Sequence, residues 1–200
     1  MTKEVESLIE LVRQKQYQNL IFDLDETLTR LDLPWEKWIE QVTASLPPDM
    51  AEKLEQLLAI DGAPWGEVVN EQITQDTDFY NQFIKICQDF EAKHFAHTPY
   101  HDLIKALPQF KEQGCKLFLW TSNTRQTAER ALVELGVRQL FTQLLTREDT
   151  RLGKPHVEGW SQFPFSSQDT GLSLMIGDSQ NDALAAQARG VAYYKISFFK

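Results

Sequence analysis

The sequence is poor in the residues that would place it in several common protein classes. It has two cysteines among 200 residues, Cys87 and Cys115. Their separation matches no metal-ligand spacing, so we expect free core thiols rather than a disulfide framework or a zinc site. No apolar run approaches the ~18 residues of a membrane span. The 20 basic residues are outnumbered by 29 acidic ones, for a net charge of −9, which argues against binding to nucleic-acid phosphates.

The remaining composition is that of a soluble globular protein, with 42% hydrophobic and 24% charged residues. The length fits one domain, or one core with a modest insertion. The acidic balance favours solubility and also suits a site for a hard divalent cation. The first ten residues are charged and lack an apolar segment. We therefore expect no signal peptide and a cytoplasmic location.

Short apolar runs alternate with helical patterns over much of the chain. The first run, Asn19 to Asp23, is too short for a helix and reads as a buried strand. Further strands are predicted at 116–120, 143–145, 172–176 and 191–196, and helices at 5–12, 101–113, 124–135 and 183–189. Pro108 is expected to kink or shorten the second of these helices. This alternation predicts an α/β fold, a Rossmann-like parallel sheet with helices on both faces.

Residues 30–99 have a different character, with helical patterns and no convincing strand. Four helices are predicted there. Pro47-Pro48 ends the first, Asp61-Gly62 ends the second, the third begins near Trp65, and the fourth covers 79–90. Roughly seventy residues of helices between two strands are too long for a crossover connection. We therefore predict a core domain of residues 1–29 and 100–200 and an inserted helical cap domain of residues 30–99.

Polar side chains follow the predicted strands or lie in the loops between them. They are Asp23, Asp25 and Thr27, then Thr121, Ser122 and Asn123, then Lys154, and finally Asp178 and Asp182. In open α/β sheets, ligands bind at the carboxyl ends of the strands. Taken singly, an Asp or Thr at such a position is often a helix cap and a Lys is usually a surface residue. Four groups in this order favour a shared site.

The four groups resemble the signatures of the haloacid dehalogenase (HAD) superfamily of phosphohydrolases. The chain carries Asp-x-Asp-x-Thr after the first strand, a hydroxyl residue after the second, a Lys in Gly-Lys-Pro, and then Gly-Asp-x-x-x-Asp. The helical insertion directly after the first signature is similar to that family's class-one cap. The resemblance implies a Mg²⁺-dependent phosphatase that acts on a small phosphomonoester. It spans nearly the whole chain.

The resemblance implies a role for each acidic residue. Asp23 would be the nucleophile that forms an aspartyl-phosphate. Mg²⁺ would bridge Asp23 and the phosphate, with Asp178 and the backbone carbonyl of Asp25 as further ligands and Asp182 binding directly or through water. Asp25 would protonate the leaving alkoxide and then activate water. Dehalogenases of the family lack an acid at that position, so Asp25 argues for an ester substrate.

The remaining candidates would bind the phosphoryl group or the substrate. Lys154 would hold Asp23 and a phosphoryl oxygen. Counting from Lys116 favours Thr121 as the motif hydroxyl, but a slip of one residue to Ser122 stays open. Asn123 is a further candidate beside them, and Thr27 another. Arg125 either contacts a substrate anion or is a surface residue of the next helix, and the sequence does not separate the two.

Other readings of the same residues remain open. The motifs would also serve a sugar phosphomutase, or a catalytically idle binding module with the same fold. His94, His97 and His101 lack zinc spacing and are expected at the surface or a hinge. Trp35, Trp38 and Trp65 either line a substrate pocket or form the cap core, and helical spacing favours the core.

Overall fold

The fold is built on five parallel strands that lie in the order β5-β4-β1-β6-β7. We describe it from a computed structural model that covers residues 1–60 and 66–197. The strands are β1 (Asn19–Phe22), β4 (Lys116–Trp120), β5 (Phe141–Leu145), β6 (Ser173–Gly177) and β7 (Ala192–Lys195). The predicted α/β class with a parallel sheet is confirmed.

The first strand lies at the centre of the sheet, and its register aligns the functional segments. Phe22 pairs with Leu119 of β4 and with Ile176 of β6. The residues that follow these three strands therefore emerge side by side at one edge. This is the topological switch point, where α/β sheets bind ligands.

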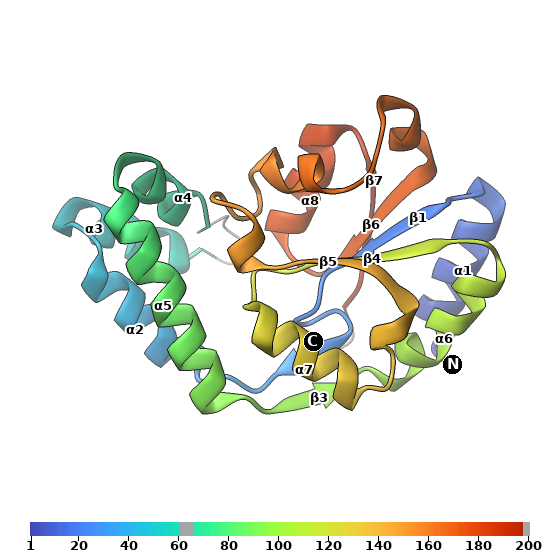
Figure 1. Cartoon of the computed structure of the whole chain (residues 1–200), viewed down its shortest axis with the longest axis horizontal. Helices are drawn as coiled ribbons and strands as arrows, with labels where there is room; N and C mark the ends of the chain where they lie inside the picture. Colours follow the sequence, from blue (N-terminus) through green and yellow to red (C-terminus); the bar gives the residue numbers. More distant parts are fainter. Residues whose placement is uncertain (61–65, 198–200) are drawn as a thin grey trace.

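Helices cover both faces of the sheet (Figure 1). Side chains alternate along β1, so Leu20 and Phe22 belong to one hydrophobic cluster and Ile21 to another. The first cluster is completed by α1 (Lys3–Lys15), α6 (His101–Glu112) and α7 (Arg125–Glu134). The second is completed by α8 (Gln180–Arg189) and by aromatic residues of the short helix η3 (Val157–Gln162) and the segment after it.

Four helices form a separate group at one side of the molecule (Figure 1). They are α2 (Trp35–Ser45), α3 (Pro48–Leu58), α4 (Gly66–Gln75) and α5 (Thr77–His94). Their apolar faces pack on one another in a hydrophobic cluster of their own. The four predicted helices are confirmed, but Asp61-Gly62 and Trp65, the predicted end and start of two of them, lie outside the described residues.

A second, two-stranded sheet joins this helical group to the main sheet. Its strands β2 (Thr29–Leu31) and β3 (His97–Pro99) are antiparallel. The prediction that residues 30–99 contain no strand is therefore wrong. Three-residue strands are too short for a period-two pattern to be recognised. Because the two strands pair, the chain leaves the core and returns to it through adjacent segments.

Two further segments differ from or add to the sequence expectations. Helix α6 runs from His101 to Glu112 with Pro108 inside it, so Pro108 does not shorten the helix, and the alternative of a kink stays a prediction. Leu107 and Phe110 are fully buried, and their packing outweighs the one backbone hydrogen bond that proline removes. After the Lys154 loop the chain forms the short helices η3 and η4 (Ser167–Leu172). Two others, η1 (Arg138–Leu140) and η2 (Arg147–Asp149), lie on either side of β5. No helix formed by the described residues is both long enough and apolar enough to cross a lipid bilayer.

Gly159 in η3 lies directly against the end of β4. A Cβ atom at this position would lie 2.3 Å from Cζ2 of Trp120, whose side chain is buried. Because Trp160 and Phe163 pack on the same ring, it has little room to move. We predict that Gly159→Ala lowers the free energy of unfolding by about 1–3 kcal/mol, as overpacking does, measured by urea denaturation.

Gly171 provides the matched control for this substitution. A Cβ atom there meets nothing within 4 Å, so Gly171→Ala should change stability by no more than about 0.5 kcal/mol. Equal effects of the two substitutions would contradict the packing role of Gly159.

Candidate active site

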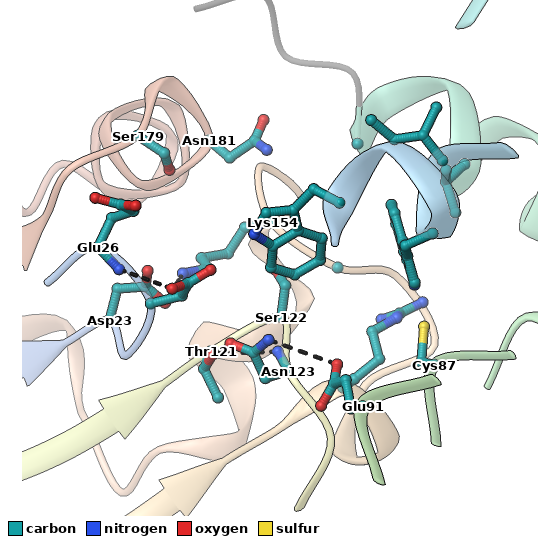
Figure 2. Close-up of a pocket in the computed structure, with 18 of the residues that line it drawn as sticks. Asp23, Glu26, Cys87, Glu91, Thr121, Ser122, Asn123, Lys154, Ser179 and Asn181 are labelled. Carbon is teal, nitrogen blue, oxygen red and sulfur yellow. Dashed lines mark hydrogen bonds and ion pairs between the residues drawn. The ribbon is translucent and has the colours of Figure 1, made fainter. Parts of the chain in front are cut away.

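A cavity of about 330 Å³ lies where the carboxyl ends of β1, β4 and β6 meet the helical group. Figure 2 shows Asp23, Thr121, Lys154 and Glu91 around it. The predicted site residues that line it are Asp23, Asp25, Thr121, Ser122, Asn123, Lys154 and Asp178. Apolar side chains of α2, α4 and α5 complete the wall, among them Trp38, Val69 and Phe83.

Lys154 is buried at the centre of this site. Its Nζ donates to Asp23 Oδ1 at 2.7 Å, to the Trp120 carbonyl oxygen at 3.0 Å and to Asp182 Oδ1. An ammonium group has three N–H donors, and each has an acceptor here. One side chain thus ties together the ends of β1 and β4 and the start of α8.

The charges in this cluster shift one another's pKa values. Burial raises the pKa of Asp23 to about 7, although Lys154 acts in the opposite direction. Burial alone would lower the pKa of Lys154, but Asp182 and Asp23 outweigh it and hold that pKa above the usual value. The lysine is therefore a fixed positive charge beside Asp23.

Asp182 is fully buried and held from both sides. While Oδ1 accepts from Lys154, Oδ2 accepts from the Ser179 hydroxyl at 2.6 Å and forms a capping box at the start of α8. A Cβ atom on Gly177 would lie 2.4 Å from Asp182 Oδ2. The glycine before Asp178 is thus required by the position of the second acid.

Three carboxylates form a group that fits a divalent cation. Asp23, Asp178 and Asp182 each offer an oxygen atom, and these atoms lie within 4.8 Å of one another. Carboxylate oxygens are the ligands that Mg²⁺ prefers. Asp23 and Asp178 also line the cavity, so a cation between them would be accessible to a ligand.

Asp25 has a different environment from Asp23. Glu26, which follows it, has a left-handed backbone conformation with φ 56°, which turns the chain sharply. The carboxylate Oδ1 then accepts from the backbone N–H groups of Leu31 at 2.7 Å and Glu26 at 3.1 Å. Burial raises the pKa of Asp25 well above its usual value. The raised pKa favours the protonated form more than in a solvent-exposed aspartate.

Thr121 and Ser122, in the loop after β4, both line the cavity. Thr121 is buried, and its hydroxyl donates to Asn123 Oδ1 at 2.8 Å, whereas Ser122 is exposed. Glu91 of α5 accepts a hydrogen bond from the Thr124 N–H at 2.9 Å. It accepts another from Asn123 Nδ2 at 3.5 Å, which Figure 2 shows as a dashed line. The helical group therefore contacts the loop that carries the second motif.

Two predicted substrate contacts do not lie at this cavity. The Thr27 side chain is fully buried, and its hydroxyl has no hydrogen-bond partner among the described residues. The guanidinium group of Arg125 pairs with Asp149, and its backbone N–H donates to Glu148. Of the two alternatives left open for Arg125, the structure thus favours the surface residue of the helix.

The cavity residues that the sequence did not predict include three polar or charged side chains outside the four motifs. Glu91 lies on the apolar stripe of α5, four residues after Cys87, and a charge on such a stripe was the available signal. Arg147 follows the end of β5, where a functional residue is expected if the strand is recognised at full length. Asn70 exchanges two hydrogen bonds with the backbone of Gly153, a pairing that no sequence pattern indicates.

Trp35 and Trp38 line the cavity and also belong to the helical cluster.

Comparison with known proteins gives relatives with named activities. The chain is 27% identical over 126 residues to pyrophosphatase PpaX of Bacillus mycoides, covering 62% of this chain and 59% of the relative. It is 25% identical over 198 residues to a phosphoglycolate phosphatase of Mesorhizobium japonicum, covering 90% of this chain and 82% of the relative. Two of the curated relatives are matched over only 53% and 59% of their own length.

The fold also matches solved structures and a family model. A crystal structure described as a predicted phosphoglycolate phosphatase from Haemophilus somnus 129pt gives a TM-score of 0.59 at 20% identity, covering 92% of this chain and 86% of that chain. At this identity the likeness concerns the fold. The model for haloacid dehalogenase-like hydrolases matches residues 20–196, which include every motif that forms the cavity. The chain therefore belongs to the haloacid dehalogenase-like hydrolase family.

Proposed function

We propose that this chain is a Mg²⁺-dependent phosphatase that hydrolyses a small phosphomonoester through an aspartyl-phosphate on Asp23. The observation that carries the proposal is the convergence of Asp23, Asp25 and Lys154 on one cavity. The names of two relatives, a pyrophosphatase and a phosphoglycolate phosphatase, support hydrolysis of small phosphate compounds.

We also infer that residues 30–99 act as a cap domain over a core of residues 1–29 and 100–200, because they have their own hydrophobic cluster.

The three-carboxylate group supports the proposed metal. Asp23, Asp178 and the backbone carbonyl of Asp25 would hold Mg²⁺. Both oxygens of Asp182 already accept hydrogen bonds, from Lys154 and Ser179, so we assign it to the ion through water. A bound Mg²⁺ would offset the repulsion between the carboxylates and a phosphate dianion and would favour ionised Asp23.

The proposed reaction uses two carboxylates in different roles. Asp23 attacks phosphorus, the bond from phosphorus to the ester oxygen breaks, and protonated Asp25 gives its proton to that oxygen. The positive charge of Lys154 would offset the charge of the phosphoryl group while its N–H donors hold Asp23 and Asp182. The Thr121 hydroxyl would turn from Asn123 Oδ1 to donate to a phosphoryl oxygen. Ionised Asp25 then takes a proton from water, which attacks the aspartyl-phosphate. Free phosphate leaves, and Asp23 is restored.

The first test is removal of the proposed nucleophile. We expect wild type to release inorganic phosphate from small phosphomonoesters with Mg²⁺ and not after chelation. Asp23→Asn should reduce this release by at least about 10³-fold, because the amide cannot form the acyl-phosphate. Circular dichroism should show a folded variant. Substantial metal-dependent phosphate release by Asp23→Asn would contradict the assignment of Asp23 as the nucleophile. Transfer of the phosphoryl group to a sugar hydroxyl, instead of release of phosphate, would indicate a mutase.

The second test separates the acid role of Asp25 from its position. With an alkyl ester, Asp25→Asn should lower kcat by about 10²–10⁴-fold, the usual contribution of acid–base catalysis. With p-nitrophenyl phosphate, the leaving group needs no proton. We then expect a burst of p-nitrophenolate close to the enzyme concentration, followed by slow turnover. Absence of the burst, with an equal loss on both esters, would contradict the acid role.

A further inference from the structure

The cavity extends beyond the groups assigned to the proposed reaction. On the side of the helical group it is lined by Arg147 together with apolar side chains of α2 and α5, including Trp38, Phe83 and Cys87. The proposed reaction uses none of these side chains. A phosphomonoester with its phosphoryl group at Asp23 would place its leaving group in the rest of the cavity, so these residues face that part of the substrate.

Arg147 is an unusual residue to find in such a wall. Its side chain is 4% exposed, and its guanidinium group lies 5.1 Å from the centre of the Phe83 ring. Charged side chains are rarely buried to this extent unless they are paired. Burial lowers the pKa of Arg147, which reflects the cost of desolvating its charge, but an arginine side chain keeps its proton in proteins.

No carboxylate neutralises this charge within 4.0 Å among residues 1–60 and 66–197. Its side-chain acceptors are two backbone carbonyl groups, those of Thr150 at 3.4 Å and Arg151 at 3.0 Å. The nearby acids have other partners. Glu158 accepts from the backbone of Arg151 and Leu152, and Glu148 accepts from the Arg125 N–H. A guanidinium group has five N–H donors, so capacity remains for a ligand.

The guanidinium group lies close to the reaction site. A Cβ atom on Gly153 would lie 3.2 Å from Arg147 Nη1, and Gly153 directly precedes Lys154. The backbone N–H of Arg147 donates to the Asn123 carbonyl at 2.9 Å, which fixes its strand end to the motif loop. Arg147 is therefore anchored to the two segments that carry Asn123 and Lys154.

We propose that Arg147 is a specificity-determining residue that binds a second acidic group, a carboxylate or phosphoryl group, on the leaving-group side of the substrate. This inference rests on the proposed phosphatase function and narrows its substrate class to small phosphate compounds whose leaving group carries a second acid. The planar fork of arginine matches both acids. The apolar surroundings of the group strengthen such a contact.

A purely structural role for Arg147 makes a different prediction. If its only task were to hold the carbonyl groups of Thr150 and Arg151, its loss would disturb the Lys154 loop and slow the hydrolysis of every ester equally. A specificity role instead changes the ratio of kcat/KM between an acidic and a neutral ester. This ratio is the decisive measurement.

The test compares phosphoglycolate with ethyl phosphate, which has a methyl group in place of the carboxylate, and adds pyrophosphate for a second phosphoryl group. We expect wild type to prefer at least one acidic compound over ethyl phosphate. Arg147→Met should lower that kcat/KM ratio by about 10- to 100-fold, the range for a hydrogen bond to a charged group. Arg147→Lys should fall between, because it keeps the charge and loses the fork.

Arg151→Met is the matched control. Arg151 carries the same charge, and its guanidinium group lies 5.8 Å from the centre of the Tyr80 ring, against 5.9 Å for Arg147. It donates to the Ile73 carbonyl, but it is exposed and does not line the cavity. This variant should keep the wild-type ratio. Equal ratios for wild type and Arg147→Met, or an equal change in Arg151→Met, would overturn the inference.

A binding measurement separates this inference from the proposed function. In the Asp23→Asn background, calorimetry with phosphoglycolate and ethyl phosphate needs no turnover. Weaker phosphoglycolate binding after Arg147→Met supports the acid site even if wild type releases no phosphate, in which case only the proposed function fails. If phosphoglycolate, pyrophosphate and ethyl phosphate bind Asp23→Asn equally well, the acid site is absent, whatever the phosphatase assay shows.

Discussion

The structure depends on one buried cation. Lys154 Nζ lies between Asp23 and Asp182 and also donates to the Trp120 carbonyl, so β1, β4, the Lys154 loop and α8 meet at a single atom. Removing one partner of a buried ion pair typically costs about 3–5 kcal/mol, because the other charge is left uncompensated. These charges can therefore be buried at low cost only when the four segments are assembled. The contacts that form the site also hold this end of the sheet together.

Much of this centre could be predicted from the sequence. Asp23 and Asp178 follow apolar runs that read as buried strands, and parallel pairing of β1 with β6 brings their ends together. Gly177 precedes Asp178 because Asp182 occupies the space of a side chain there. Each of these features is local or follows from the general topology of parallel sheets. They needed no knowledge of how the helical group lies on the core.

The features of the site and its connections that the sequence did not predict depend on contacts between distant segments. The strands β2 and β3 are three residues each and form only because they pair with each other. Glu91 looked like one more helix residue, yet its carboxylate binds the backbone and hydroxyl of Thr124. The role proposed for Arg147 likewise depends on the position of its guanidinium group beside Phe83 of α5 and Gly153. Hydrophobic periodicity reports which face of a helix is buried, and not which charged group it will meet.

The two carboxylates of the first motif illustrate how one strand end can supply two different functional groups. Asp23 still pairs with the β6 backbone through its N–H group and faces Lys154, whereas the left-handed turn at Glu26 directs Asp25 to the backbone of β2. Among residues 1–60 and 66–197, Asp23 has a cationic partner in Lys154, and Asp25 has none within 4.0 Å. In this part of the chain no ammonium group therefore opposes the effect of burial on the pKa of Asp25. Strand β2 begins the connection from the core to the helical group. Asp25, the carboxyl group proposed to act on the leaving group, is therefore held by the segment that leads to the helices on the leaving-group side of the cavity.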